Sequence, residues 1–278
     1  MSRPYCFLHI PRTAGTTLNL ILRDHFGPEA ILSLYTASEF SSNREVAVAD
    51  LDSVRLFQGH LLLERYDPPR LYGRDVDVFT FLREPVARLV SEYVFLKTWP
   101  RSHMYQIVNR MSFRDYIVGE HKHVRFKGKN FMTRVLSGRS VDGQEQAASA
   151  LSAAKTNLER VFGFFGIQEF FDESLILLAR YLGLHKYCYE KRNALRSGYA
   201  VELTDADREV ALEFNTADVE LYAFAKALLQ ERISAGGAAL ALELERFRRI
   251  NASYQKVCAL ISDRVGLVPD GSIHLPKA

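Results

Sequence analysis

Short, almost wholly apolar runs alternate along the chain with segments in which apolar residues recur at helical spacing. Four runs have the length and the aromatic and β-branched content of strands, and they span Tyr5–Ile10, Val54–His60, Val76–Leu82 and Val161–Ile167. The third is nearly continuous in apolar residues, which is typical of a parallel strand buried on both faces. Helical spacing begins after the first run and returns in residues 86–96, 147–158 and 169–182. This alternation predicts an α/β protein with a mainly parallel sheet and helices on both faces.

Polar and glycine signals divide the C-terminal part of the chain into further helices. Thr204-Asp-Ala-Asp207 has the pattern of a capping box, and the helix that it opens is expected to continue toward Ile233. Gly236-Gly237 ends it, and a last, charged helix is expected over residues 238–264. We therefore predict a domain over residues 1–235 and a C-terminal helical extension and tail over 236–278, packed on the domain or extending from it. The apolar positions of the extension predict a homodimer element or an arm across the core, and they are Leu242, Leu244, Phe247, Ile250 and Tyr254.

A turn of small and hydroxylated residues, Pro11-Arg-Thr-Ala-Gly-Thr-Thr17, separates the first strand from the first helix. Free backbone N–H groups and the positive end of the helix dipole meet in such a turn, so it can hold an anion. Its three threonines can donate hydroxyl hydrogen bonds, and Arg12 can add a charged, planar fork. With one glycine and no lysine, the turn is not a Walker A loop. It predicts either a phosphate-binding loop or an ordinary turn with threonine as the N-cap.

A second candidate anion contact follows the most apolar strand. That strand ends at Arg83-Glu-Pro85, where proline favours the start of a helix. Arg83 and Ser91 are eight residues apart, close to two helical turns, so both can face the end of the strand. Together they can grip a second phosphate. Alternatively, Arg83 caps the helix and Ser91 is a small packing residue.

The composition narrows the partners and the compartment. With 36 basic and 33 acidic residues, the 278-residue chain has a formal net charge of +3, which argues against a nucleic-acid partner. Three scattered cysteines favour a reducing compartment, and the early first strand leaves no room for a signal peptide, so we expect a cytoplasmic protein. No apolar run reaches transmembrane length. No carboxylate or histidine cluster has the spacing of metal ligands, so no metal is expected.

Two motifs carry a resemblance to a known family, the turn 11–17 and Leu82-Arg-Glu-Pro-Val-Ala-Arg-Leu-Val-Ser-Glu-Tyr93. They resemble the 5′-phosphosulfate loop and the 3′-phosphate site of sulfotransferases that use 3′-phosphoadenosine 5′-phosphosulfate (PAPS). The chain is most similar to the branch of the heparan sulfate 2-O- and 6-O-sulfotransferases and their bacterial relatives. Further matches follow in the family's order, at Gly59-His60, Asn130-x-x-Thr-Arg134, Asn157-Leu-Glu159, Phe164-x-Gly-x-x-Glu169 and Asn215-x-x-Asp218. The resemblance spans roughly residues 5–233 and implies a P-loop-like, three-layer fold.

The resemblance also implies an activity and roles for individual residues. PAPS donates a sulfuryl group to an acceptor hydroxyl of a carbohydrate by in-line attack, adenosine 3′,5′-bisphosphate leaves, and no metal is required. His60 matches the family's histidine and is expected to be the general base, because imidazole titrates near neutral pH. Glu64 is the carboxylate alternative, and His9 is expected to be a core residue. Arg12 stands where the family usually has lysine and is expected to stabilise the leaving group. The expected nucleotide-binding residues, of which the last two select the 3′-phosphate, are Arg12, Thr13, Ala14, Gly15, Thr16, Thr17, Arg83 and Ser91.

A basic and irregular segment over residues 97–129 is the expected acceptor side. Residues 121–129 hold four Lys/Arg and two His without an acidic residue, so they form either a solvated face or a surface for an acidic glycan. Trp99 and Tyr105 either stack on sugar rings or pack the loop itself. The expected substrate-binding residues are Lys97, Trp99, Arg101, His121, Lys122, His123 and Arg125. Two other functions stay open: a P-loop nucleotide kinase or NTPase, and a family member that binds a nucleotide or glycan without catalysis.

Overall fold

A five-stranded sheet forms the centre of the molecule. The computed structural model describes residues 3–35, 51–61, 63, 70–190 and 201–265. The sheet has the order β2-β3-β1-β6-β7, and every adjacent pair is parallel. Its strands are β1 (Tyr5–Leu8), β2 (Ile31–Leu34), β3 (Leu56–Gly59), β6 (Asp77–Leu82) and β7 (Phe162–Ile167). A separate antiparallel pair consists of β4 (Arg70–Leu71) and β5 (Arg74–Asp75). The predicted parallel α/β architecture is confirmed.

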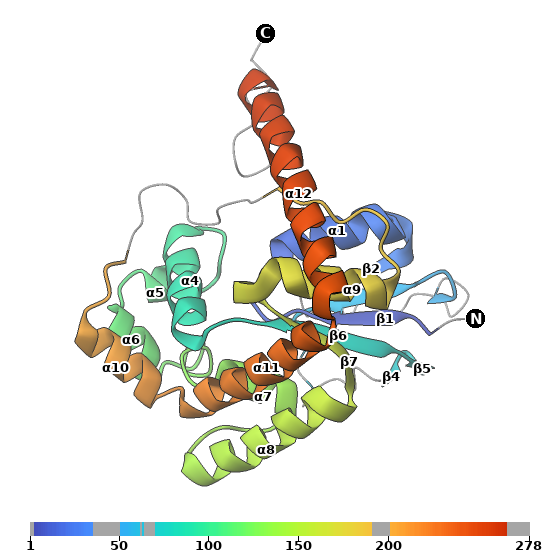
Figure 1. Cartoon of the computed structure of the whole chain (residues 1–278). Coiled ribbons are helices and arrows are strands. Elements are labelled where there is room, and N and C mark those ends of the chain that lie inside the picture. Colours follow the sequence, from blue (N-terminus) through green and yellow to red (C-terminus); the bar gives the residue numbers. More distant parts are fainter. Residues whose placement is uncertain (1–2, 36–50, 62, 64–69, 191–200, 266–278) are drawn as a thin grey trace.

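Helices cover both faces of the sheet and give the molecule three layers (Figure 1). One face carries α1 (Gly15–Phe26) and α9 (Phe171–Leu182), and the other carries α7 (Phe131–Ser137), α8 (Gln144–Arg160) and α11 (Thr216–Ala235). The 3₁₀ turns are η1 (Pro28–Ala30) and η2 (Gln168–Phe170). Successive residues of a strand point to opposite faces of the sheet. Phe7 therefore packs on the face covered by α1 and α9, while Cys6 and Leu8 pack on the face covered by α7, α8 and α11.

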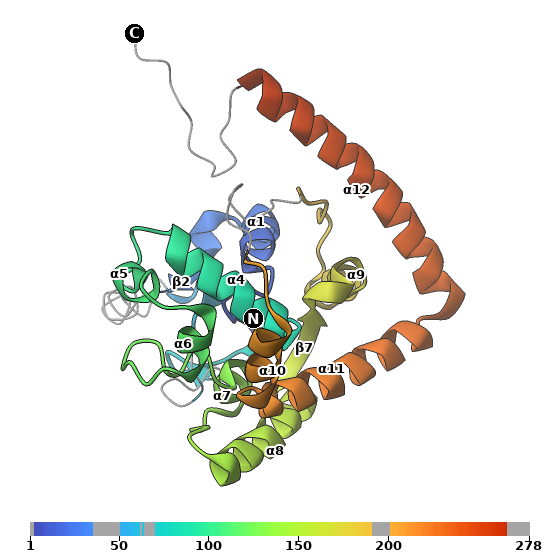
Figure 2. The same cartoon turned by 90° about the vertical axis from the view of Figure 1, so that its left-hand side faces the viewer.

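A third apolar cluster lies beyond the sheet, on the side that Figure 2 turns toward the viewer. It joins α4 (Pro85–Thr98), α5 (Tyr105–Val108), α6 (Phe113–Val118) and α10 (Asp205–Glu213). Leu89 and Tyr93 of α4 meet Tyr116 of α6 and Val210 of α10 there, and all four side chains are buried. The segment predicted as irregular therefore contains two short helices. Each is too short for helical periodicity to emerge from the sequence.

The helix predicted from Thr204 toward Ile233 is two helices, and the prediction of one continuous helix is wrong. The capping box of Thr204 and Asp207 is confirmed at the start of α10. The chain turns at Asn215, whose side-chain amide donates to the carbonyl groups of Ala211 and Gly128. These bonds tie the turn to a segment 87 residues away, a constraint that local sequence does not reveal.

The last helix, α12 (Gly237–Val265), begins where the glycine pair predicts. Leu240 and Phe247 are buried in the core beside α9, and Oδ1 of Asn251 accepts a hydrogen bond from the backbone of Tyr189 at 2.8 Å. Ile250 and Tyr254 are exposed, and the far end of α12 extends beyond the rest of the described fold (Figure 1). The N-terminal part of α12 thus packs on the core, and its C-terminal part extends from it. The domain boundary at 235/236 and the homodimer stay predictions.

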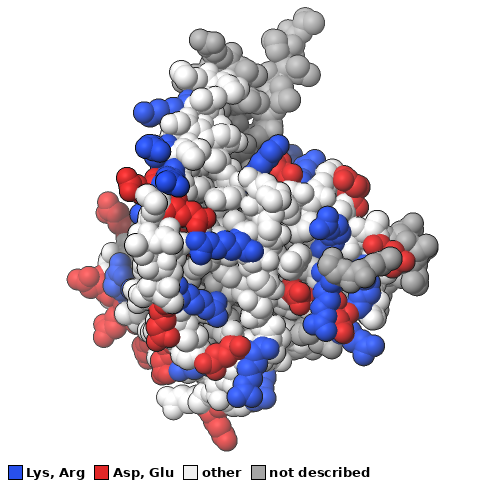
Figure 3. Space-filling view, turned by 45° about the vertical axis from the view of Figure 1, so that its right-hand side comes forward, with Lys and Arg blue, Asp and Glu red and all other residues white. Residues whose placement is uncertain are grey.

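The surface carries both signs of charge. Figure 3 shows Lys and Arg side chains interspersed with Asp and Glu on one face, in line with the modest net charge of +3. Of the helices that the structure describes, none has the length and apolar content to cross a bilayer.

Candidate active site

Polar side chains from four segments meet at one edge of the sheet, because the carboxyl ends of parallel strands point the same way. The turn 11–14 follows β1, His60 follows β3, Arg83 follows β6, and Glu169 follows β7. From β1 the chain goes first to the side of β2 and β3, with β3 next to β1, and then crosses to the other side for β6 and β7. Ligands of open α/β sheets bind at such a change of direction. The structure therefore places the turn, His60 and Arg83 at the same edge of the sheet, as the sequence predicts.

The turn before α1 leaves backbone N–H groups available. The N-cap of α1 is Ala14, no side chain caps the helix, and its first turn has no acidic residue. The hydroxyl group of Thr13 donates to the carbonyl of Ile10 at 2.7 Å, so in this structure it stabilises the turn, and the predicted contact of Thr13 with a nucleotide stays a prediction. Thr16 is exposed and Thr17 half-buried, in the first turn of α1. The prediction of a threonine N-cap is therefore wrong, and the orphan N–H groups of this helix end are of the kind that can bind an anion.

Backbone strain marks the same turn. Arg12 and Ala14 have left-handed conformations with φ of 70° and 68°. The backbone of a residue that has a Cβ rarely adopts this conformation. Such strain costs about 1–3 kcal/mol per residue and is found most often at functional sites. The carbonyl group of Arg12 accepts a hydrogen bond from Nη1 of Arg83 at 3.1 Å, which helps to hold the strained conformation.

Position 15 must be glycine because the ring of His9 occupies the space of a Cβ there. A Cβ at position 15 would lie 1.8 Å from Nε2 of the His9 ring. Burial, His60 and Arg12 together lower the pKa of His9 well below its ordinary value, so its ring is neutral. Nδ1 of His9 is buried, and it has no hydrogen-bond partner among the described residues. The prediction of a core residue missed that this ring lies against the anion-binding turn.

His60 lies at the end of β3, and a hydrogen bond defines its tautomer. Its Nδ1 lies 2.8 Å from the backbone carbonyl of His9, and since a carbonyl only accepts, Nδ1 carries the proton. The neutral ring then keeps its lone pair on Nε2, as a general base requires. The ring is exposed and packs 4.7 Å from that of His9 and 4.9 Å from that of Tyr35, centroid to centroid. Glu64, the alternative base, lies outside the described residues.

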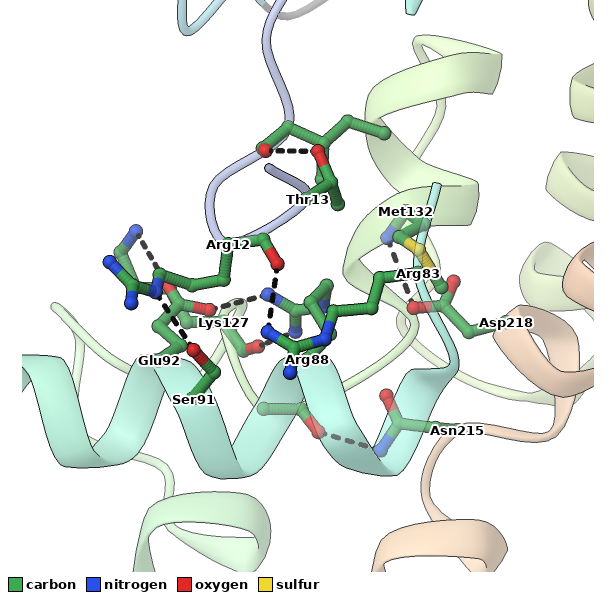
Figure 4. A network of polar contacts seen from close by, with 12 residues as sticks. Arg12, Thr13, Arg83, Arg88, Ser91, Glu92, Lys127, Met132, Asn215 and Asp218 are labelled. Atoms are coloured by element: carbon green, nitrogen blue, oxygen red, sulfur yellow. Dashed lines mark hydrogen bonds and ion pairs between the residues drawn. The ribbon is translucent and has the colours of Figure 1, made fainter. Parts of the chain in front are cut away.

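Arg12 and Arg83 concentrate positive charge beside the turn (Figure 4). Nε of Arg12 donates to Oγ of Ser91 at 3.0 Å, and its guanidinium lies over the ring of Phe95 at 4.9 Å. Burial and then Arg83 lower the pKa of Arg12, and burial is also the main cause of the lowered pKa of Arg83. Neither arginine has an ion pair at salt-bridge distance among the described residues. Two neighbouring cations of this kind form a site for an anion.

A buried ion-pair network lies beside Arg12 and Arg83 along α4 (Figure 4). Arg88, fully buried, pairs with Glu92 one turn later, and Lys127 reaches the second carboxylate oxygen at 3.2 Å. Burial acts to raise the pKa of Glu92, but Lys127 and Arg88 outweigh it and hold the pKa below its ordinary value. Arg88 also donates to the backbone carbonyl of Lys127 at 2.9 Å. The network therefore fixes the basic segment against the helix that carries Ser91.

Arg83 does not cap α4, and Ser91 is more than a small packing residue. Glu84 caps α4, since its carboxylate accepts hydrogen bonds from the backbone N–H groups of Val86 and Ala87 at 3.1 and 2.7 Å. Arg83 is therefore not the cap. Ser91 is buried and contacts the guanidinium of Arg12, so it does more than pack helices.

The expected acceptor residues divide into two groups. Nζ of Lys97 donates to Oη of Tyr93 and to the carbonyl of Met111, so its role in the structure is to tie α4 to the following segment. Trp99 stacks on Phe95 with ring centroids 5.6 Å apart. Ser91, Phe95 and Trp99 are spaced four residues apart and therefore lie on one side of α4 and its C-terminal end. The expected residues with exposed side chains are Arg101, His121, Lys122, His123 and Arg125. Their contact with an acceptor stays a prediction.

Other motif residues join segments that are distant in the sequence. Both carboxylate oxygens of Asp218 accept hydrogen bonds from the first turn of α7, from the backbone of Met132 at 3.0 Å and of Thr133 at 2.7 Å. Nδ2 of Asn157 donates to the carbonyl of Leu136 at 2.7 Å. Glu169 accepts from the backbone of Glu84 and from Oη of Tyr222. These residues hold the helices around the site in place.

By fold, the protein is a three-layer α/β protein with a parallel central sheet and helices on both faces. Sequence comparison narrows the class to a family, because the model of the galactose-3-O-sulfotransferase family matches residues 3–277. The chain belongs to this family of carbohydrate sulfotransferases, and the predicted resemblance is confirmed.

Two curated relatives give the range of similarity. Galactose-3-O-sulfotransferase 3 of Mus musculus is 27% identical over 251 residues, which cover 84% of this chain and 58% of the relative. Heparan-sulfate 6-O-sulfotransferase 3 of Mus musculus is 26% identical over 198 residues, which cover 62% of this chain and 42% of the relative. The chain thus spans about half the length of these relatives. A crystal structure of mouse sulfotransferase SULT7A1 complexed with PAP has a TM-score of 0.38 and 14% identity, covering 78% of this chain and 66% of that one, and is too distant to carry an argument.

Proposed function

We propose that this protein transfers a sulfuryl group from PAPS to a hydroxyl group of a carbohydrate. The observation that carries the proposal is the meeting of an uncapped helix N-terminus, two arginines and a tautomer-defined histidine at one sheet edge, in a chain of a sulfotransferase family. A donor with phosphate at both ends of its ribose matches two anion contacts, and an acceptor hydroxyl needs a base beside them.

The donor is held by main chain and side chains together. The backbone N–H groups at the start of α1, with the hydroxyl groups of Thr16 and Thr17, bind the 5′-phosphosulfate. Arg83 and Ser91 bind the 3′-phosphate, and Arg12 adds charge to the same nucleotide. The described residues contain no group of three potential metal ligands, and independence from metal stays a prediction.

His60 removes the acceptor proton in this mechanism. As the acceptor oxygen attacks sulfur, its proton passes to Nε2 of His60, while Nδ1 stays bonded to the carbonyl of His9. The bond between sulfur and the bridging phosphate oxygen breaks, and adenosine 3′,5′-bisphosphate leaves with the electron pair. The N–H groups of the turn stabilise the charge that develops on the leaving phosphate, because they are already aligned before the reaction. The chemistry resembles phosphoryl transfer, in which positioning and charge stabilisation dominate.

The acceptor is a glycan in this proposal, and a galactose hydroxyl is the first candidate. The matched family and one relative are named for galactose 3-O-sulfation, while the other relative is named for heparan sulfate 6-O-sulfation. The exposed basic residues of segment 97–129 suit a glycan that already carries acidic groups. A cytoplasmic location remains a prediction.

The proposal is tested by binding and then by turnover. In calorimetry, adenosine 3′,5′-bisphosphate should bind at least ten times more tightly than ATP with Mg²⁺; the reverse order would favour a nucleotide kinase. Turnover with ³⁵S-labelled PAPS on galactose-terminated and heparan acceptors should label one class of glycan. Tight nucleotide binding without labelling of any glycan would favour a non-catalytic binding protein and would contradict the proposal.

A further inference from the structure

Three aromatic rings lie in a row past the ends of three adjacent strands. The registers place the last residues of β2, β3 and β1 beside one another. The next residues along the chain are Tyr35, His60 and His9, so these three follow the order of the sheet, with His60 in the middle. Ring centroids lie 4.9 Å apart for Tyr35 and His60, 4.7 Å for His60 and His9, and 5.7 Å for Tyr35 and His9. The expected base thus contacts an aromatic ring from each neighbouring strand end.

Tyr35 lies across the ring of His60. The planes of these two rings meet at 79°, and the plane of Tyr35 meets that of His9 at 84°. Edge-to-face pairs of this kind are among the favoured arrangements of aromatic side chains. The contact from Nδ1 of His60 to the carbonyl of His9, at 2.8 Å, holds one end of the imidazole. Tyr35 restricts the movement that this bond alone leaves open, which is a swing of the ring about the bonded nitrogen.

Helix α1 contacts both rings that flank His60. Nδ2 of Asn19 donates to Oη of Tyr35 at 2.7 Å, and Oδ1 of Asn19 is buried without a hydrogen-bond partner among the described residues. Asn19 lies one helical turn after Gly15, against which the ring of His9 lies. The two contacts therefore come from the same side of α1. The N-terminus of this helix is the proposed site of the 5′-phosphosulfate.

We propose that Tyr35 is a positioning residue, which fixes the orientation in which Nε2 of His60 meets the acceptor hydroxyl and, through Asn19, ties the base to the helix that holds the donor. The inference rests on the proposed function and adds a residue to its site. Tyr35 itself exchanges no proton in the transfer. A base acts only where its lone pair meets the acceptor proton, and a displacement of about 1 Å can cost about 100-fold in rate.

Substitutions at Tyr35 separate the role of its ring from that of its hydroxyl group. Tyr35→Leu should lower kcat for sulfuryl transfer by about 10- to 100-fold, because the ring of the base can then swing. Tyr35→Phe keeps the ring and loses only the bond to Asn19, so its kcat should fall by less than about fivefold, and Asn19→Ala should match it. The affinity for adenosine 3′,5′-bisphosphate should stay within about twofold in all three variants. Tyr187→Leu, at a half-buried tyrosine that stacks on Phe247 of α12, is the matched control and should retain the normal kcat.

A double variant shows whether Tyr35 acts through the base. His60→Asn lacks Nε2, so adding Tyr35→Leu to it should change the residual kcat by less than about twofold, because residues that act as a unit are not additive. A full further loss of kcat in the double variant would overturn the proposal. So would a kcat of Tyr35→Leu within about twofold of normal, or equal losses of kcat and of nucleotide affinity.

The motion of the His60 ring can be measured without turnover, by ¹³C relaxation of its Cε1–H group in histidine-labelled protein. Tyr35→Leu should increase this motion, and Tyr35→Phe should leave it close to normal. An equally rigid ring in Tyr35→Leu would overturn the proposal whether or not the protein transfers a sulfuryl group. If the unmodified protein transfers none to any glycan, the proposed function itself fails, which is a separate result. Tyr35→Met replaces Tyr35→Leu if thermal melting shows that the latter is unfolded.

Discussion

Replacing His60 with asparagine separates the roles of the two ring nitrogens. The amide nitrogen of asparagine occupies nearly the position of Nδ1 in histidine, so His60→Asn retains a donor for the His9 carbonyl, now 2.8 Å from Nδ1. The variant has no atom in the place of Nε2. It therefore removes the proposed base and leaves the hydrogen bond that positions the side chain.

The expected loss follows from the role of the missing nitrogen. General-base catalysis contributes about 10²–10⁴-fold, so kcat for sulfuryl transfer should fall by that factor in His60→Asn. The affinity for adenosine 3′,5′-bisphosphate should stay within about twofold, because the nucleotide contacts come from other segments. The free energy of unfolding should hardly change in His60→Asn, whereas His60→Ala should lose up to about 1 kcal/mol with the hydrogen bond to His9.

The assay is initial-rate transfer of labelled sulfate at saturating PAPS, with calorimetry and urea unfolding on the same preparations. His185→Asn is the matched control, since His185 is exposed after α9 and should tolerate the same substitution without loss of activity. A His60→Asn protein with more than about one tenth of the normal kcat would refute the assignment of the base. Equal losses in activity and in nucleotide affinity would show a positioning role instead.

Three further predictions concern the turn and the supports of the site. Glu92→Gln should lower the free energy of unfolding by about 3–5 kcal/mol in urea titrations, because it leaves the buried Arg88 and the partly buried Lys127 without their carboxylate. Since folding lowers the pKa of Glu92, its contribution is present above about pH 5 and is lost as the pH falls toward the lower, folded-state pKa. A variant whose stability deficit stayed constant below about pH 4 would contradict this. Gly15→Ala should abolish nucleotide binding in calorimetry because its Cβ meets the ring of His9, and the double variant with His9→Ala should restore part of the binding; absence of any loss would show that the turn adapts. Asp218→Asn should destabilise the protein by about 1–3 kcal/mol in thermal or urea unfolding, because an NH₂ group then faces a backbone donor of α7, and unchanged stability would show that one accepted bond suffices.

Much of the fold could be read from the sequence because buried parallel strands are strongly apolar. The strand that ends at Leu82 is the clearest case. The capping box at Thr204 also predicted the start of a helix correctly. The edge strand β2 lacked this signal, since three of its four residues are only half-buried. The break between α10 and α11 depends on bonds from Asn215 to a distant segment, so no local pattern could reveal it.

The site was predicted less completely than the fold. Strand ends placed His60 and Arg83 at the sheet edge correctly, because the rule for parallel sheets concerns only the backbone. No sequence pattern indicated that Arg12 donates a hydrogen bond to Ser91, 79 residues away, or that the ring of His9 covers Gly15. Both contacts depend on the direction of side chains in a strained turn. The left-handed backbone at Arg12 and Ala14 is unexpected for residues with a Cβ, and only the structure shows it.

Several residues that carry the family resemblance act as supports of the structure. Asn215, just before α11, and Asp218 of α11 hold the segment that leads into α7, and Glu169 joins the start of α4 to Tyr222. In this structure these motif residues maintain the arrangement of the helices around the site. We expect selection of the acceptor to depend on the exposed part of segment 97–129, whose residues the sequence marks only by their charge.

The central claim is sulfuryl transfer from PAPS to a sugar hydroxyl. Its most direct test is to incubate the protein with ³⁵S-labelled PAPS and a galactose-terminated oligosaccharide, and to locate the label by mass spectrometry of the purified product. We expect one sulfate on a galactose hydroxyl, and the sulfated product and adenosine 3′,5′-bisphosphate should form in equal amounts. Release of the bisphosphate with the label in inorganic sulfate alone, or no turnover of PAPS with any glycan, would contradict it.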